Sequence, residues 1–246
     1  MVLAAFATSA CSLALDWNGL TRDSGPCLGE SGPAMVQIGS YCIDATEVTG
    51  ADYQLFIDTA PDPKAQIVEC ALNTAFEPTD WPIMPDKANH PVTFVDWCDA
   101  FAYCAWAGKA LCGRLEGGPV PHEDKDNPEV SQWYRACTRN GTREYPYGDV
   151  EEPVCNAGTV GMNETAPVDG HPECVGGYEG IFDLVGNVAE WDDTCSPTLS
   201  TELDDPCLTR GDDFDMMGSA SCRESFGVAR LTAAPYIGFR CCSLLR

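Results

Sequence analysis

The stretch Gly177–Trp191 has the sequence Gly-Tyr-Glu-Gly-Ile-Phe-Asp-Leu-Val-Gly-Asn-Val-Ala-Glu-Trp. Apolar residues alternate with small and acidic ones, so no helical face can be drawn through it. Gly180, Gly186 and Asn187 supply positions where the backbone can adopt a positive φ. The pattern therefore predicts an irregular but specifically shaped loop.

The same stretch and its flank are rich in carboxylates. Asp183, Glu190, Asp192 and Asp193 fall within eleven residues. An irregular turn frees backbone carbonyls, and carbonyls combined with one or two carboxylates form the hard-oxygen site that calcium prefers. The alternative is a Gly-rich loop with a solvated acidic edge, since the spacing lacks the fixed pattern of an EF-hand. The spacing alone leaves both interpretations open.

Composition limits the class of protein. The 246 residues fit one large domain or two small ones, and a hydrophobic content of 44% is enough for a core. The 18 Pro and 23 Gly favour a loop-rich, mixed architecture over a helical bundle. A formal net charge of −24 makes a nucleic acid a poor partner.

Cysteine usage indicates an oxidising compartment. The chain has 15 Cys but only three His, and no Cys-x-x-Cys pair occurs. Zinc ribbons and thioredoxin-like sites are therefore disfavoured. Dispersed cysteines in a chain without repeats predict disulfides.

The first residues resemble the end of a bacterial lipoprotein signal peptide. Val2–Ala10 is apolar and small, and Cys11 follows it as the residue that would carry the lipid. Fourteen cysteines then remain, which allows seven disulfides with none left over. No Lys or Arg precedes the run, so a start site assigned too late is the alternative explanation.

These features predict three segments. Residues 1–11 are the remnant of the signal peptide, 12–32 a polar tether and 33–246 the folded domain. The expected location is extracytoplasmic, as a periplasmic or outer-membrane lipoprotein attached to the membrane through Cys11.

Local signals predict few regular elements. They are a strand within Met35–Tyr41 and helices at Gly50–Thr59, Trp97–Trp106 and Ser131–Cys137. In the first helix Tyr53, Phe56 and Ile57 share one face, which predicts that they pack in the core.

Three hypotheses about disulfides follow from the positions of the cysteines. Cys112 and Cys137 flank an insert rich in Gly, Pro and charge, and could close it as a loop. The adjacent Cys241 and Cys242 favour two separate bridges, because a vicinal pair rarely bonds to itself. Four further cysteines bracket the Gly177–Trp191 stretch and are predicted to link its loops: Cys155, Cys174, Cys195 and Cys207.

From about Pro33 onward the chain resembles the formylglycine-generating enzyme (sulfatase-modifying factor) family. The matching segments occur in family order: Met35–Ile38, Tyr41–Thr49, Pro91–Trp97, Ala100–Lys109, Tyr145–Gly148, Gly180–Trp191, Arg210–Gly211 and Ile237–Arg240. The resemblance implies an α+β fold with a C-type-lectin-like core. It further implies that the domain is loop-rich, low in regular secondary structure and braced by disulfides.

In the oxidases of that family, two cysteines near the C-terminus hold Cu(I) and engage the substrate cysteine. Cys222 aligns with the second of them, but Met216 stands where the first belongs. One thiolate cannot form a two-sulfur Cu(I) site. The resemblance therefore favours a domain that is degenerate for cysteine oxidation and binds an unknown protein or peptide ligand, as a monomer. The alternative is an active copper-dependent oxidase that converts a substrate cysteine to formylglycine at a rearranged site around Met216–Cys222.

The resemblance also implies calcium. One family site would use the side chains of Asp183 and Glu190 with the carbonyls of Gly186 and Val188 as a structural calcium site. The alternative role for the two carboxylates is capping of backbone N–H groups in the loop.

A second family site would begin at Asn156 and use the carbonyl of Ala157. Its distal Asp aligns with Val160, which has no oxygen in its side chain. The sequence therefore supports this second site less than the first.

Overall fold

The computed structural model describes residues 27, 29, 31–158, 163–196, 205–215 and 220–245. Cys11, Val160 and Met216 lie outside these residues, as do the predicted signal remnant and most of the tether. Within the tether, Cys27 is bonded to Cys42. The chain is thus attached to the domain from Cys27 onward.

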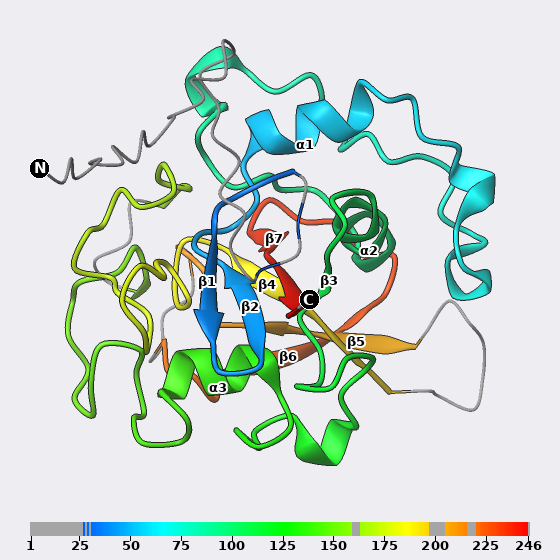
Figure 1. Ribbon diagram of the computed structural model, residues 1–246. Coiled ribbons are helices and arrows are strands. Elements are labelled where there is room, and N and C mark those ends of the chain that lie inside the picture. The colour runs from blue at the N-terminus through cyan, green and yellow to red at the C-terminus, as the bar shows by residue number, and fades with distance from the viewer. Residues whose placement is uncertain are drawn as a thin grey trace, which may run out of the picture.

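Two small sheets form the centre of the domain (Figure 1). The first has the order β1-β2-β8-β3 and is antiparallel throughout. The second has the order β6-β5-β4-β7, in which only β4 and β7 run parallel. The strands of the first sheet are β1 Met35–Ile38, β2 Tyr41–Asp44, β3 Ala110–Leu111 and β8 Cys241–Leu244; those of the second are β4 Ala189–Cys195, β5 Pro206–Arg210, β6 Ser225–Ala229 and β7 Ile237–Phe239.

In the described part of the chain, three α-helices flank the sheets. They are α1 Gly50–Ile57, α2 Trp97–Trp106 and α3 Gln132–Thr138. Four single-turn 3₁₀ helices lie in the connections: Pro63–Ala65, Val68–Cys70, Pro85–Lys87 and His122–Asp124. In Figure 1, α1 and α2 lie on one side of the central strands and α3 on the other. The predicted helices are confirmed, and the α+β, loop-rich fold class with them.

Capping explains where the first two helices begin. The Thr49 side chain accepts from Asp52 N at α1, and that of Asp96 accepts from Asp99 N at α2. In both cases the residue at the third helical position reaches back to the cap, which completes a capping box. These side chains satisfy N–H groups that have no partner within the helix.

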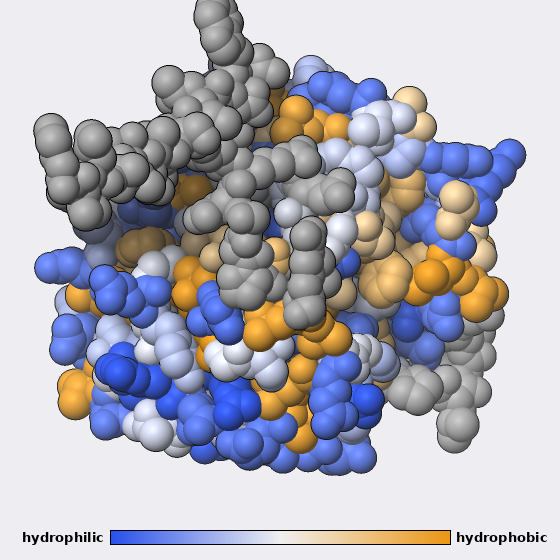
Figure 2. Space-filling view, viewed as in Figure 1, coloured by the Kyte–Doolittle hydropathy of each residue, from blue (hydrophilic) through white to orange (hydrophobic). Residues whose placement is uncertain are grey.

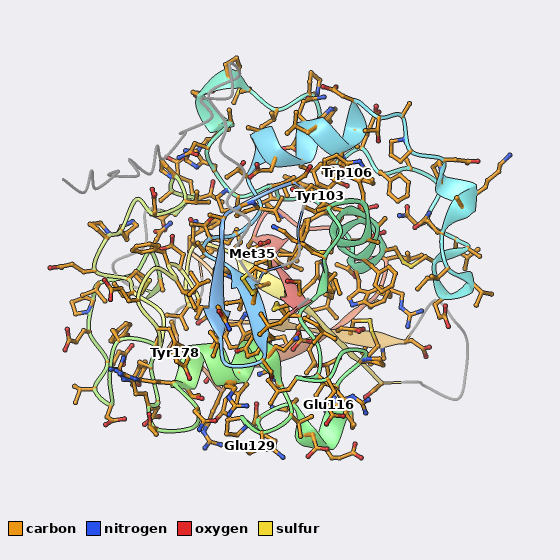
Figure 3. The ribbon with its side chains drawn as sticks, in the orientation of Figure 1. Met35, Tyr103, Trp106, Glu116, Glu129 and Tyr178 are labelled. Atoms are coloured by element: carbon orange, nitrogen blue, oxygen red, sulfur yellow. A yellow bond between two sulfur atoms is a disulfide. The ribbon has the colours of Figure 1, made fainter. Side chains whose placement is uncertain are left out.

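The helices meet through aromatic side chains. Tyr53 and Phe56 of α1 are buried, as the i, i+3 spacing predicts. The Phe56 ring lies 5.9 Å from that of Tyr103 and 5.7 Å from that of Trp106, both on α2. Figure 3 shows Tyr103 and Trp106 between these two helices. This cluster continues to Phe239 on β7, so it joins the helices to the second sheet.

Seven disulfides brace the described chain. They are Cys27–Cys42, Cys70–Cys98, Cys104–Cys241, Cys112–Cys242, Cys137–Cys222, Cys155–Cys174 and Cys195–Cys207. The separate bridges at Cys241 and Cys242 are confirmed, and so are the links around the Gly177–Trp191 stretch.

The proposed Cys112–Cys137 bridge is wrong. Cys112 follows β3, which pairs with β8, and this pairing brings Cys112 to Cys242. Cys137 instead bonds Cys222, 85 residues further along the chain. Strand pairing, rather than closeness along the sequence, decides both partners.

None of the described helices is long and apolar enough to cross a membrane. On the face drawn in Figure 2, hydrophilic residues surround smaller apolar patches.

A buried ion pair fixes the entry to β3. Lys109 Nζ lies 2.5 Å from Asp44 Oδ1, and the two side chains are 1% and 0% exposed. Lys109 also donates to Pro33 O, while Asp44 Oδ2 accepts from Cys241 N. Burial raises the pKa of Asp44 to about 6, although Lys109 opposes that rise.

We expect Lys109→Met to lower the free energy of unfolding by about 3 kcal/mol, because it leaves the Asp44 carboxylate buried without a cation. The double variant Asp44→Asn/Lys109→Met should lose less than Lys109→Met alone. Urea unfolding of the three proteins measures both differences. Equal losses for the single and double variants would show that the ion pair is not what holds this region together.

Candidate functional site

The Gly177–Trp191 stretch forms the loop that leads into β4. Gly180, Gly186 and Asn187 all have positive φ (84°, 75° and 59°), as predicted. A Cβ on Gly186 would lie 2.7 Å from Asn156 O, so only glycine fits there. The loop is therefore held tightly against the segment that carries Asn156.

The Asn187 side chain is the central connection of this region. Its Nδ2 donates to Glu47 Oε1 at 2.9 Å and to Ala166 O at 3.3 Å. Its Oδ1 accepts from Ala166 N at 2.8 Å and from Asn156 Nδ2 at 3.2 Å. A buried amide with all its positions used fixes the geometry of the loop.

Glu190 forms the second connection. Arg240 Nη2 lies 2.6 Å from Glu190 Oε1, and both side chains are fully buried. Trp133 Nε1 on α3 donates to Glu190 Oε2 at 2.8 Å. Arg240 uses its remaining donors on the carbonyls of Asp44, Phe182 and Asp183.

Three buried carboxylates share this one guanidinium. Glu47, Asp183 and Glu190 are 0%, 2% and 0% exposed, and Arg240 is the cation beside them. Burial, followed by repulsion from Asp183, raises the pKa of Glu47 well above its usual value. Burial also raises the pKa of Asp183 to about 6. Glu47 Oε2 has no hydrogen-bond partner among the described residues.

The four residues predicted to hold calcium lie in this loop and at the start of β4. Asp183 Oδ2 accepts from Asp169 N at 2.9 Å, which is the capping role considered as the alternative. Glu190 is engaged by Arg240 and Trp133, so an ion would share that carboxylate. No group of three or more His, Cys, Asp or Glu side chains suited to a metal occurs in the described ranges. The charge balance nevertheless fits a cation here, because one guanidinium faces three carboxylates.

The second predicted calcium position has a different arrangement. Asn156 Nδ2 donates to Glu164 O and to Asn187 Oδ1, so the side chain links loops. Ala157 lies next to Gly186, 2.9 Å from where a Cβ there would be. Val160, which aligns with the distal ligand, is outside the described residues.

Cys222, the candidate catalytic residue, is bonded to Cys137 and fully buried. Every cysteine among the described residues is in a disulfide. Cys222 therefore offers no thiolate in this structure, and nothing is described for Met216.

A cleft of about 410 Å³ opens on one face of the second sheet. Residues from all four strands line the cleft, together with residues of the turn after β5 and the residue before β7. Its lining is Ala189, Thr209, Asp213, Asp215, Phe226, Val228, Tyr236 and Ile237.

The opposite face of that sheet holds a third buried ion pair. Arg210 Nε donates to Asp192 Oδ2 at 2.7 Å, and the guanidinium stacks over the Trp133 ring at 5.4 Å. Arg210 also reaches Asp126 and the carbonyl of Lys125. In the sequence Arg210 belongs only to the short Arg210–Gly211 motif, and no local signal identifies its partners.

A family model, the sulfatase-modifying factor enzyme 1-like domain, matches residues 19–244. The chain belongs to this family. Mouse formylglycine-generating enzyme is 29% identical over 210 residues, which is 66% of this chain and 51% of that protein. The bovine protein named inactive C-alpha-formylglycine-generating enzyme 2 is 32% identical over 173 residues, 64% of this chain and 52% of that protein.

The chain thus spans about half the length of the curated relatives it matches. Among solved structures, CarF covers 89% of this chain and 98% of its own, with a TM-score of 0.59 and 22% identity. At that identity the likeness shows a shared fold only. The family expected from the motifs is therefore confirmed, and its fold with it.

The turn beside the cleft yields a pH prediction. Asp212 is 2% exposed and has a φ of 63°, and burial raises its pKa from 3.8 to about 6. Its stabilising contribution is complete below the unfolded value of 3.8 and is lost as the pH rises through about 6. Asn tolerates positive φ and can accept the same hydrogen bond, so it mimics the protonated acid.

At about pH 8 the free energy of unfolding of Asp212→Asn should therefore be about 1 kcal/mol higher than that of the parent protein. The difference should shrink as the pH falls through 6 towards 4. Urea titrations across this range measure it, with the exposed Asp149→Asn as the matched control. A variant that is less stable than the parent at high pH would contradict the prediction.

Proposed function

We propose that this domain does not oxidise cysteine and instead acts as an extracytoplasmic binding domain. The disulfide between Cys137 and Cys222 carries this proposal. Family-type chemistry needs two thiolates on Cu(I), because soft sulfur selects that ion. Here the position of one thiolate is Met216 and the other sulfur is bonded within a disulfide.

The residues around that position support the same conclusion. Asp213 and Asp215, which precede Met216 in the sequence, line the cleft, and oxygen ligands favour hard cations over Cu(I). Relatives of similar identity include a protein named formylglycine-generating enzyme and one named inactive C-alpha-formylglycine-generating enzyme 2, so membership of the family alone does not imply that this chain oxidises cysteine. Ligand binding by the loops of this fold does not require the two thiolates.

The scaffold itself suits binding. Disulfides and buried ion pairs hold long loops in fixed positions. Pre-formed loops lose little conformational freedom when they bind a ligand. Disulfides of this number also support an extracytoplasmic location, and a lipid on Cys11 would attach such a domain to a membrane.

The competing proposal is an active oxidase that uses Met216 and Cys222. It would require the Cys137–Cys222 bond to open, so that one thiolate and one thioether could hold copper. Such a protein would convert a peptide cysteine to formylglycine with O2, releasing the sulfur as sulfide and reducing the second oxygen atom to water with two electrons from an external thiol.

An activity assay separates the two. We expect no aldehyde on a sulfatase-type cysteine peptide incubated with the protein, copper, oxygen and a thiol reductant, measured by mass spectrometry. Mouse formylglycine-generating enzyme serves as the positive control. The variant Cys137→Ser, which frees Cys222, should stay inactive, because a single thiolate does not rebuild a two-sulfur site. Copper-dependent turnover by the parent protein would overturn the proposal.

We also propose that a structural calcium ion is held by the side chains of Asp183 and Glu190 with the carbonyls of Gly186 and Val188. The ion would offset the excess of buried carboxylates over Arg240. It would fix the loop that enters β4, where calcium tolerates mixed carbonyl and carboxylate ligands.

Removing calcium should lower the melting temperature. At free calcium about 100 times its dissociation constant, the ion would contribute about 2.7 kcal/mol. Asp183→Asn should abolish this dependence, while Asp58→Asn, on the exposed end of α1, should keep it.

Elemental analysis then counts the ions. One calcium per chain supports the site at Asp183 and Glu190, and two would add the site at Asn156 and Ala157. A melting temperature that does not depend on calcium, together with no bound ion, would refute both sites.

A further inference from the structure

We propose that residues 12–20 of this chain dock in an apolar groove beside α2. The groove lies between α1, α2 and the loop that follows α1, and it has a volume of about 300 Å³. Residues 12–20 are outside the described ranges. The docking does not depend on whether the domain oxidises cysteine or holds calcium. The lining of the groove includes Phe56, Ile67, Phe76, Phe101, Ala105 and Trp106.

The sequence of α2 is that of a helix covered on every side. Asp99 is the only charged residue among its 10. One side is buried in the core through Trp97, Ala100, Tyr103 and Cys104. The side that faces the groove has the i, i+3, i+4, i+7, i+8 spacing of a single helical face, with Cys98, Phe101, Ala102, Ala105 and Trp106.

This second face is apolar but still accessible. Ala105 is exposed, and Phe101 and Trp106 are half-buried. A helix that is apolar all round is normally buried on all sides. The composition of α2 therefore indicates that a further apolar segment covers its groove side.

The opposite wall of the groove also exposes apolar side chains. Ile67 and Val68 are 37% and 70% exposed, and Leu72 is 51% exposed. The Cys70–Cys98 disulfide joins this wall to α2 and holds the two walls at a fixed separation. A contiguous exposed apolar patch of this kind marks an interaction site.

The polar side chains at the groove take part in hydrogen bonds within the loop. Asp62 Oδ1 accepts from Lys64 N at 2.9 Å, and Gln66 Nε2 donates to Asn73 O at 3.0 Å. No Lys or Arg is among the described residues that line the groove. The groove therefore offers mainly apolar contact, which suits an occupant with apolar side chains.

The chain enters the domain next to this groove. A Cβ on Gly29 would lie 2.6 Å from Lys109 Cε, and one on Gly32 would lie 2.7 Å from Tyr103 Oη. The ring of Tyr103 on α2 lies 5.5 Å from that of Trp106, which lines the groove. The chain therefore reaches the domain within about one helical turn of the groove.

Residues 12–20 have a pattern that fits the groove. They read Ser-Leu-Ala-Leu-Asp-Trp-Asn-Gly-Leu, so Leu13, Leu15 and Trp17 recur at every second position. A period of two places these side chains on one side of an extended segment, with Asp16 and Asn18 on the other. The apolar side can then lie in the groove while the polar side faces solvent.

The connection to the domain is long enough for this contact. Fully extended, the residues from Trp17 to Cys27 span up to about 35 Å, whereas α2 is about 15 Å long. A short flexible connection also gives the attached segment an effective concentration in the millimolar range, which favours it over a second copy of the chain.

A photo-cross-linker placed in the segment tests the contact in the full chain. Trp17 is replaced by p-benzoylphenylalanine, the unreduced protein is irradiated, and the cross-linked peptides are mapped by mass spectrometry. We expect cross-links to peptides that contain Ile67, Phe101 or Trp106. The same cross-linker in place of Asn18 should lose most of these cross-links, because it lies on the other side of the extended segment.

A groove variant and a matched control assign the contact. Ala105→Glu places a charge on the groove side of α2 at little cost in helix propensity, and it should abolish the cross-links from position 17. Ala51→Glu makes the same change at an exposed position of α1 outside the lining and should leave the cross-links intact. Circular dichroism checks that both variants are folded.

Four results would overturn the assignment. They are cross-links from position 17 that fall outside the groove, equal yields from positions 17 and 18, yields that Ala105→Glu leaves unchanged, and cross-links that join two chains. The last is detected in a mixture of heavy-isotope-labelled and unlabelled protein, and it would give the groove to a second copy.

Native mass spectrometry tests for another occupant. A co-purifying lipid that Ala105→Glu removes, together with no cross-link from position 17, would identify a lipid site and overturn the docking of the segment. None of these outcomes affects the proposal that the domain does not oxidise cysteine, which the oxidase assay tests separately.

Discussion

The buried ion pair between Glu190 and Arg240 is the interaction on which the rest of the domain depends. It joins β4 to the segment between β7 and β8, and Trp133 adds α3 to the same carboxylate. The guanidinium also binds carbonyls from β2 and from the loop before β4. Removing one partner of such a pair leaves a buried charge without compensation, which is far more costly than losing an exposed pair.

This arrangement explains how a chain with little regular secondary structure holds long loops in place. One face of the second sheet packs partly on aromatic residues of α1 and α2 and partly lines the cleft, and the other face holds Glu190–Arg240 and Asp192–Arg210. Disulfides then join strands to loops far away in sequence, as Cys137–Cys222 and Cys104–Cys241 do. Two clefts lie beside this braced centre; Phe214 and Pro235 line one of them, and their sequence neighbours Asp213 and Tyr236 line the other.

Local patterns in the sequence were enough to place the helices and the irregular loop. Capping residues at Thr49 and Asp96 and positive-φ residues at Gly186 and Asn187 act within a few residues, so their effect can be seen in the sequence. The motif order also identified the family and hence the fold.

Long-range partners could not be found in this way. Cys112 was paired with the wrong cysteine because its partner depends on β3 lying beside β8. The contact of Glu47 with Asn187 joins residues 140 positions apart, and no local signal marks it. Of the two carboxylates in the calcium hypothesis, Asp183 lies in the loop and Glu190 lies on β4, and the contact of Arg240 with Glu190 was not anticipated.

Cysteine oxidation of the family type uses two sulfur atoms. This chain has the family fold, but its one remaining cysteine of that pair, Cys222, is in a disulfide with Cys137. The central claim is therefore that Cys222 is not a thiol. Alkylation of the unreduced protein followed by peptide mapping tests it most directly. The account predicts a peptide in which Cys222 is joined to Cys137 and no alkylated Cys222. An alkylated Cys222 in the folded protein, with Cys137 also unpaired, would contradict it.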